Sequence, residues 1–276
     1  MTRVLVLVHL HRGEAVEVAK TVAEALRGDG DEVVMPREDA EVAGLGIFAV
    51  DDITAEPVDL VVAIGGDGTM LRAARLLGDA APILGVNAGN LGYLTEVEPD
   101  DAVGAVRRFH RGDHRIEQRM RLEGEAEGAR FLALNEVVIE KTGPGHTIRV
   151  SVSFDGSHFT TYEADGLIVA TPTGSTAYNL SARGPIVDPE VRATILTPVS
   201  PHMLFDRSMV IGPEVSVQLS LEGYRPAVVS ADGQRVAELD PGQSVTCRGS
   251  SAASFVRFGP RNFHGILKTK FQLPER

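Results

Sequence analysis

The chain has 276 residues, of which 27 are Lys or Arg and 38 are Asp or Glu, for a formal net charge of −11. Hydrophobic residues at 43% and charged residues at 24% are ordinary globular usage, which argues against a disordered or membrane protein. So acidic a chain repels polyanions at long range, and nucleic acid is not an expected partner, although local amide dipoles can still bind a small anion.

The first predicted element is a buried strand over Val4–His9. Its apolar run, Val4 to Val8, is too short to span a bilayer or to form a signal peptide. Cys247 is the only cysteine, which excludes an intrachain disulfide and a Cys-based metal site. We therefore expect a cytoplasmic protein with no membrane association.

Strands and helices alternate in the first part of the chain. Apolar residues at helical spacing predict a helix over 12–26. The other predicted elements are strands at 32–35, 58–64 and 82–86 and a short helix at about 70–77. This alternation predicts an α/β domain with a parallel sheet over residues 1–112.

From Ile116 onward the sequence changes character, because short β-rich segments follow one another, separated by turn signals. The predicted strands are 131–140, 147–154, 166–170, 215–221, 227–230 and 244–247, and one helix begins near Ser175. Residues 113–255 are therefore predicted to form a second, mainly antiparallel β-rich domain.

The sharpest local signal is Gly65-Gly66-Asp67-Gly68-Thr69, where a predicted strand meets a predicted helix. Three glycines leave no Cβ to block a phosphate, and their N–H groups with the helix N-terminus can cradle an anion. Thr69 is the predicted N-cap. An acid inside such a cradle indicates metal coordination or acceptance of a hydroxyl proton, although a tight turn with Asp67 merely capping the helix is the alternative.

A second motif, Asp165 to Tyr178, consists of a strand preceded by an acid and a run of small and hydroxyl residues that enters a helix. Small residues let a planar base approach the backbone, where N–H and C=O groups can hydrogen-bond its edge. The Tyr178 ring offers a stacking surface, with packing in the core as the alternative.

Together the two motifs resemble those of the bacterial NAD kinases. Further matches lie in order along the chain: Gly85-Val86-Asn87, Gly89-Asn90-Leu91-Gly92, Asn135-Glu136, Asn179-Leu180-Ser181, Thr197-Pro198, Pro201-His202 and Asp232-Gly233-Gln234. The resemblance implies an NAD kinase-like two-domain fold, an α/β N-terminal domain with a parallel sheet plus a mainly antiparallel β-rich C-terminal domain. It also implies that a final segment, residues 256–276, returns to the first domain.

The same resemblance implies an enzyme that transfers the terminal phosphate of ATP, or of polyphosphate, to the 2′-hydroxyl of the adenosine ribose of NAD, giving NADP. It further implies a divalent metal ion, usually Mg²⁺, and a homodimer or homotetramer. Two other functions stay open on the residues themselves. A related lipid or sugar kinase could share the Gly-Gly-Asp-Gly loop, and a non-catalytic NAD-binding sensor would need no acid at position 67.

Residue roles follow from the resemblance position by position. Asp67 is the expected catalytic residue and would orient and deprotonate the 2′-hydroxyl. The expected phosphate-binding residues are Gly65, Gly66, Gly68, Thr69 and Arg72. The expected NAD-binding residues are Asp67, Gly68, Asn135, Glu136, His146, Asp165, Thr176, Ala177, Tyr178, Ser181 and Gln234. The metal ligands stay unassigned.

Two positions depart from the family pattern. Arg183 stands where many relatives have the first glycine of a Gly-Gly-Pro run, and we expect it near the end of the helix, with Gly184 available for a positive-φ cap. Glu163 stands where some relatives carry arginine, which puts in doubt a cationic contact to the pyrophosphate of NAD from this position.

Overall fold

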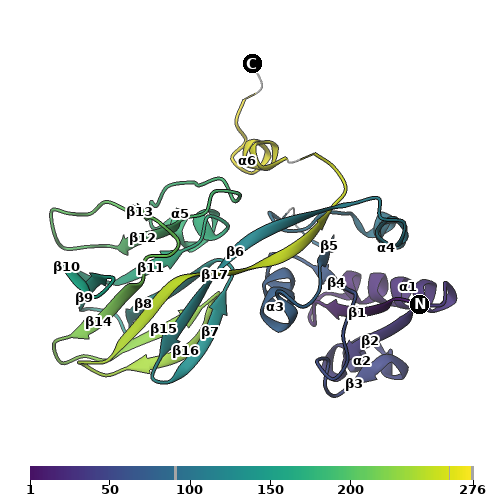
Figure 1. Cartoon of the computed structure of the whole chain (residues 1–276), viewed down its shortest axis with the longest axis horizontal. Helices are drawn as coiled ribbons and strands as arrows, with labels where there is room; N and C mark the ends of the chain where they lie inside the picture. The colour runs from purple at the N-terminus through teal and green to yellow at the C-terminus, as the bar shows by residue number, and fades with distance from the viewer. Residues whose placement is uncertain (90–91, 261, 275–276) are drawn as a thin grey trace. The chain divides into compact units, whose positions relative to one another are not determined.

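The computed structural model describes residues 1–89, 92–260 and 262–274. The chain divides into two compact units, Met1–Gln118 with Ala253–Arg276, and Arg119–Ala252. It passes from one unit to the other within two long strands, β6 (Arg115–Ala126) and β17 (Ser244–Arg257) (Figure 1).

The first unit contains a parallel sheet in the order β17-β5-β4-β1-β2-β3. Its strands are β1 (Arg3–Val8), β2 (Glu32–Pro36), β3 (Ala49–Val50), β4 (Leu60–Gly65) and β5 (Ile83–Asn87), with the end of β17 joining through Phe255 beside Ile83. The central strands β1, β4 and β5 are almost continuously apolar because helices cover both faces of this sheet.

One face of the sheet packs against α1 (Gly13–Gly28), α2 (Arg37–Ala43) and α4 (Ala102–His110), whose small apolar residues share a core with alternate residues of β1 and β4. The other face packs against α3 (Asp67–Leu77), where Met70 lies against Gly85. The strand order reverses between β1 and β4. In open α/β sheets such a reversal places the ligand outside the carboxyl ends of those strands.

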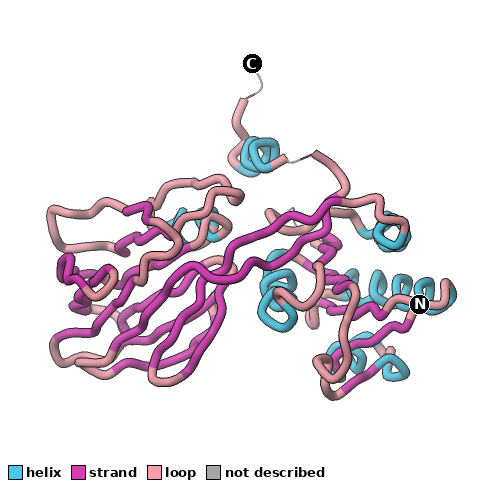
Figure 2. The backbone as a smooth tube through the Cα atoms, in the orientation of Figure 1, coloured by secondary structure: helices cyan, strands magenta, loops and turns pink. Residues whose placement is uncertain are grey.

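The second unit is built from antiparallel strands, drawn in magenta in Figure 2. One sheet has the order β13-β12-β11-β8-β15-β16, and the other contains β10-β9-β14 paired with the first part of β17, which also pairs β6. The bounds are β7 (Ala129–Ala133), β8 (Glu136–Lys141), β9 (Ile148–Phe154), β10 (Ser157–Ala164), β11 (Gly166–Ala170), β12 (Thr194–Val199), β13 (Met209–Ile211), β14 (Val217–Glu222), β15 (Ala227–Ala231) and β16 (Gln234–Leu239). Apolar side chains of both sheets form one core, including Val137, Leu167, Val150 and Leu219.

The observed elements differ from the predicted ones at the points that matter for function. The helix after the glycine loop begins at Asp67, three residues early, so Gly66 is its N-cap and the prediction of Thr69 in that role was wrong. The strand predicted over 131–140 is interrupted at Leu134 and Asn135. The helix predicted near Ser175 is a 3₁₀ turn, Gly174–Thr176, followed by the one-turn α5 (Tyr178–Ser181).

The remaining short elements are 3₁₀ turns at Gly46–Phe48 and Pro99–Asp101, and the C-terminal helix α6 (Phe263–Lys270). A search of the described residues for a helix with the length and apolar character needed to cross a bilayer finds none.

Arg183 adopts the left-handed conformation itself, with φ of 65°, which corrects the expectation that Gly184 supplies it. Gly184 is required for another reason, because a Cβ there would lie 2.0 Å from Asn179 Oδ1. We expect Arg183→Gly to raise the free energy of unfolding by about 0.5–1 kcal/mol, since glycine relieves the left-handed strain at some entropic cost. Urea unfolding measures this change.

Arg183→Ala is the matched control because it removes the same side chain and keeps the Cβ at positive φ. It should leave the free energy of unfolding at or below the parent value. Equal stabilisation by alanine would show that the arginine side chain, and not its backbone conformation, is unfavourable.

Candidate active site

The glycine loop lies at the carboxyl end of β4 and leads directly into α3. A Cβ at Gly65 would lie 2.2 Å from Thr69 Oγ1 and 3.1 Å from His9 Cβ, so only glycine fits there. Gly66 and Gly68, in contrast, have no atom within 4 Å of the position that a Cβ would occupy. These two glycines leave open space beside a helix N-terminus, whose free N–H groups and dipole favour an anion.

The Asp67 carboxylate is held by the backbone of the segment that follows β5. The N–H groups of Tyr93 and Leu94 each donate to Oδ1 at 3.0 Å, and Tyr93 also approaches Oδ2 at 3.0 Å. A Cβ at Gly92 would lie 2.3 Å from Asp67 Oδ1, so glycine makes this approach possible. Asp67 is therefore oriented by residues outside its own helix. Asn90 and Leu91, which belong with Gly92 to the matched motif Gly89-Asn90-Leu91-Gly92, lie outside the described residues.

Arg72, expected near the phosphates, pairs with a buried acid. Its Nη1 and Nη2 donate to the two carboxylate oxygens of Asp39, at 2.8 and 2.5 Å, and Asp39 has no exposed surface. Asp39 also accepts a hydrogen bond from the backbone N–H of Val8, at 2.7 Å. The pair thus ties α3 to α2 and to the end of β1.

A second cation lies beside the glycine loop. Arg12 follows β1, donates from Nη1 to the Ala88 carbonyl at 2.9 Å, and lies against Gly89, where a Cβ would be 1.5 Å from that nitrogen. The carboxyl ends of β1 and β4 are adjacent, and His9, in the same loop as Arg12, lies next to the space that a Cβ on Gly65 would occupy. The family resemblance, carried over position by position, suggested Arg72 and not Arg12.

In the second unit, Asp232 holds the segment on which Asn135 and Glu136 lie. Its carboxylate accepts hydrogen bonds from three successive backbone N–H groups, those of Leu134 at 2.8 Å, Asn135 at 2.7 Å and Glu136 at 3.2 Å. Asp232, the first residue of the matched motif Asp232-Gly233-Gln234, therefore has a structural function. Gln234 itself is exposed at the start of β16.

The same segment is fixed to the small-residue run of the second motif. The Thr171 N–H donates to the Asn135 carbonyl at 2.8 Å, and Thr171 Oγ1 donates to the Leu134 carbonyl at 2.6 Å. A Cβ at Gly174 would lie 2.1 Å from the Asn135 carbonyl oxygen. The two motifs thus meet backbone to backbone, as the small residues allow.

Glu136 is a buried carboxylate next to Tyr178. Burial, with the nearby Asp232 charge, raises the pKa of Glu136 from its ordinary value of 4.5 to about 7, against an opposing hydrogen bond from the Tyr178 N–H. Its Oε2 is buried and has no hydrogen-bond partner among the described residues. A buried acceptor without a donor is costly, so this atom is suited to accept a ligand hydroxyl.

We expect the stability of the free protein to fall as pH rises from about 4.5 to 7, by up to about 3 kcal/mol from this group. Between these values the unfolded chain has lost the Glu136 proton while the folded chain keeps it. Glu136→Gln should flatten this part of the profile, measured as urea unfolding at pH 5, 6, 7 and 8. Parallel profiles for parent and variant would contradict the raised pKa.

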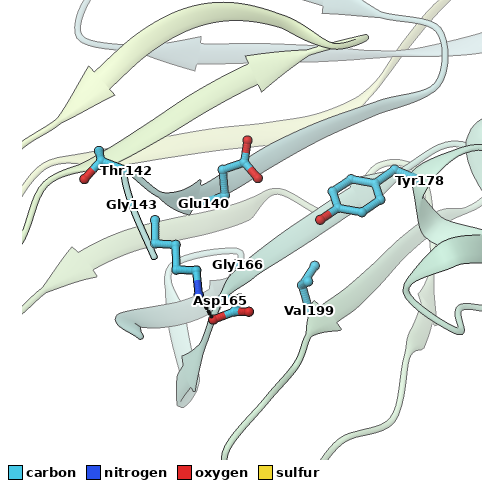
Figure 3. A pocket seen from close by; sticks show the side chains of 8 residues that line it. Glu140, Thr142, Gly143, Asp165, Gly166, Tyr178 and Val199 are labelled. Atoms are coloured by element: carbon cyan, nitrogen blue, oxygen red, sulfur yellow. Dashed lines mark hydrogen bonds and ion pairs between the residues drawn. The ribbon is translucent and has the colours of Figure 1, made fainter. Parts of the chain in front are cut away.

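Tyr178 also lines a pocket of about 300 Å³ (Figure 3). Eight residues line it: Glu140, Lys141, Thr142, Gly143, Asp165, Gly166, Tyr178 and Val199. Lys141 Nζ donates to Asp165 Oδ1 at 2.5 Å. Tyr178 is 38% exposed, which favours the stacking interpretation over core packing. Glu140 and Lys141 follow Glu136 on the same strand but gave no sequence signal of their own.

The other predicted site residues occupy less specific positions. Thr176 donates from Oγ1 to the Thr173 carbonyl at 3.3 Å, Ala177 is the N-cap of α5, and Ser181 is the last residue of that helix. His146 lies in the turn between β8 and β9, with Nδ1 3.2 Å from the Pro144 carbonyl. Within the described part of the chain, no group of three or more His, Cys, Asp or Glu side chains is arranged to hold a metal ion.

Comparisons with known proteins cover most of the chain. Residues 4–114 match the family model of the ATP-NAD kinase N-terminal domain, and residues 134–258 match that of the ATP-NAD kinase C-terminal domain. The NAD kinase of Heliobacterium modesticaldum is 41% identical, with 99% of each chain covered. The NAD kinase of Methanopyrus kandleri is 42% identical, with 94% of this chain and 93% of the relative covered.

Solved structures also resemble this chain over its whole length. A crystal structure of an NAD kinase from Archaeoglobus fulgidus in complex with ATP covers 100% of both chains at a TM-score of 0.75 and 29% identity. Yeast NADH kinase complexed with NADH covers 100% of this chain and 89% of its own, at a TM-score of 0.88 and 22% identity, and supports the fold. The lipid- or sugar-kinase and sensor alternatives are not favoured by these matches. The chain belongs to the NAD kinase family.

Proposed function

We propose that the chain transfers the terminal phosphate of ATP to the 2′-hydroxyl of the adenosine ribose of NAD, with Asp67 as the residue that orients this hydroxyl and accepts its proton. The observation that carries the proposal is the Asp67 carboxylate, held by two backbone N–H groups at the N-terminus of α3 beside open glycines. Phosphoryl transfer depends mainly on positioning and charge stabilisation, and an oriented carboxylate beside a phosphate cradle supplies both.

For the donor phosphates we propose the N–H groups of Gly66 and Gly68 at the start of α3, with Gly65 and Thr69 shaping the loop behind them. Arg12 takes the cationic role that the sequence suggested for Arg72. Among the described residues the Arg12 side chain donates to Ala88 alone, and Arg12 lies at the strand-order reversal, whereas both terminal nitrogens of Arg72 bind Asp39.

For NAD we propose that Glu136 Oε2 accepts a ribose hydroxyl and that Asn135 contacts the same nucleoside. Tyr178 stacks on a ring, with Thr176, Ala177 and Ser181 beside it and Asp165 in the adjoining pocket. His146 and Gln234 complete the proposed contacts at the edge of this region.

Mg²⁺ is the proposed metal ion, bound through the ATP phosphates, because Mg²⁺ in phosphoryl-transfer sites takes one or two carboxylates with substrate phosphates. Asp67 is the carboxylate at the glycine loop that would bind this ion. When bound, such an ion would supply positive charge that neutralises the transferring phosphoryl group. We also propose that polyphosphate can replace ATP and that the chain forms a homodimer or homotetramer, as the family resemblance implies.

The direct test incubates purified protein and Mg²⁺ with ATP and NAD, then measures NADP with an NADP-specific dehydrogenase. Reactions without ATP, without NAD or with EDTA are the controls, and polyphosphate replaces ATP in a further arm. Formation of NADP that depends on both substrates is expected. ATP hydrolysis without NADP would contradict the proposed acceptor.

A further inference from the structure

Leu94 connects the Asp67 carboxylate to a buried arginine. Its N–H donates to Asp67 Oδ1 at 3.0 Å, and its carbonyl accepts a hydrogen bond from Arg257 Nη1 at 2.9 Å. Both bonds lie within the first unit, because Arg257 is the last residue of β17 and belongs to the part of that unit formed by Ala253–Arg276. One of the two N–H groups that hold Asp67 is therefore tied to a side chain 163 residues further along the chain.

The Arg257 guanidinium is itself held between two carboxylates. Its side chain is only 7% exposed, with Nη1 3.2 Å from Glu96 Oε2 and Nη2 3.5 Å from Glu117 Oε1. Glu117 is buried on β6, which pairs β17 (Figure 1). A buried cation that binds acids from two sides has few alternative positions, so its bond to the Leu94 carbonyl has a fixed direction.

The chain beyond Leu94 is anchored independently of Arg257. The N–H groups of Glu96 and Val97 donate to the Gly85 carbonyl on β5, at 2.9 and 3.2 Å. Loss of the Arg257 side chain would leave these bonds in place and deprive the carbonyl of the buried Leu94 of its donor. The change would therefore be concentrated at Leu94.

We propose that Arg257 is a positioning residue for phosphoryl transfer, which holds Leu94 so that Leu94 holds the Asp67 carboxylate toward the reacting hydroxyl. Phosphoryl transfer depends on placement, and a displacement of about 1 Å can lower the rate about 10²-fold. This inference rests on the proposed function, since it assigns a support to the residue proposed to accept the proton.

The test is a double-mutant cycle of Arg257→Met with Asp67→Asn, measured as kcat for NADP formation per folded molecule. Arg257→Met should lower kcat about ten- to hundredfold in the parent and less than about twofold in Asp67→Asn, where the carboxylate to be positioned is already absent. The KM for NAD should stay within a few-fold of the parent. Hydrogen exchange at the Tyr93 and Leu94 amides, measured without substrates, should become at least about tenfold faster in Arg257→Met.

Arg121→Met is the matched control. Arg121 is 2% exposed and donates to the carbonyl and the hydroxyl of Ser251 at 3.3 and 2.6 Å, within the second unit. Its loss should lower stability but leave kcat per folded molecule and the two exchange rates unchanged. Arg257→Lys keeps the buried charge with one nitrogen in place of a planar pair, so its kcat should lie between those of the parent and Arg257→Met. Arg257→Lys replaces Arg257→Met in the cycle if the methionine variant does not fold.

Equal losses of kcat in both backgrounds, or the same loss in Arg121→Met, would overturn the proposal, because they would indicate a general loosening of the fold. Unchanged exchange at Tyr93 and Leu94 would overturn it as well. Both results would leave the kinase function standing. The exchange needs no turnover, so a parent that forms no NADP would refute the kinase function, while faster exchange in Arg257→Met would still show that Arg257 holds Leu94.

Discussion

Asp67→Asn is expected to lower kcat by at least about 10²-fold, the lower end of the contribution of general-base catalysis. The asparagine keeps the size of the side chain, and its Oδ1 can still accept from both Tyr93 and Leu94, because Oδ1 receives both of these bonds in the parent. The loop geometry should therefore survive while the charge and the proton acceptor are lost. NAD affinity should change much less than kcat, because the proposed contacts of Asn135, Glu136 and Tyr178 with NAD do not involve Asp67.

Steady-state kinase assays and calorimetric titration with NAD on one preparation measure both quantities. Asp100→Asn, an exposed acid of the same unit, is the matched control and should behave as the parent. Near-normal turnover would remove Asp67 from the mechanism. Loss of NAD binding in parallel with turnover would make Asp67 a substrate anchor.

The fold was largely predictable because its signals are local and periodic. Nearly continuous apolar runs such as Val58–Ile64 indicate strands covered on both faces, and the change to short β segments after residue 112 indicated a second architecture. The element boundaries were less predictable where backbone contacts decide them. Asp67 begins α3 three residues early, and Arg183 adopts a conformation that its side chain disfavours.

The site was predictable where the motifs match the family, and less so where one side chain acts on another. Asp232 was part of a matched motif, but its three hydrogen bonds to residues 134–136 depend on a contact that no spacing reveals. Asp39 resembles a solvent-facing helical acid in the sequence, although it is fully buried. The resemblance suggested Arg72 for phosphate binding, and no feature of the sequence indicates its ion pair with Asp39.

The Asp39–Arg72 pair yields the largest expected change in stability. Asp39→Ala should lower the free energy of unfolding by about 3–5 kcal/mol, because it leaves the Arg72 guanidinium without its buried counter-charge. The Val8 N–H loses its acceptor at the same time. Urea unfolding with kcat and KM measured on the folded fraction separates loss of fold from loss of function.

The double variant Asp39→Ala/Arg72→Met removes both charges and should recover most of the lost stability, since an apolar replacement of a buried pair is often neutral. Arg72→Met alone should be destabilised by an uncompensated Asp39. If Arg72 only anchors α3, the double variant keeps its KM for ATP within a few-fold of the parent, whereas Arg12→Met raises it at least tenfold. A large rise in the KM for ATP in both Arg72 variants, with the KM of Arg12→Met unchanged, would instead make Arg72 the cation that binds the donor phosphates. A folding defect could not explain such a rise, because the double variant recovers its stability.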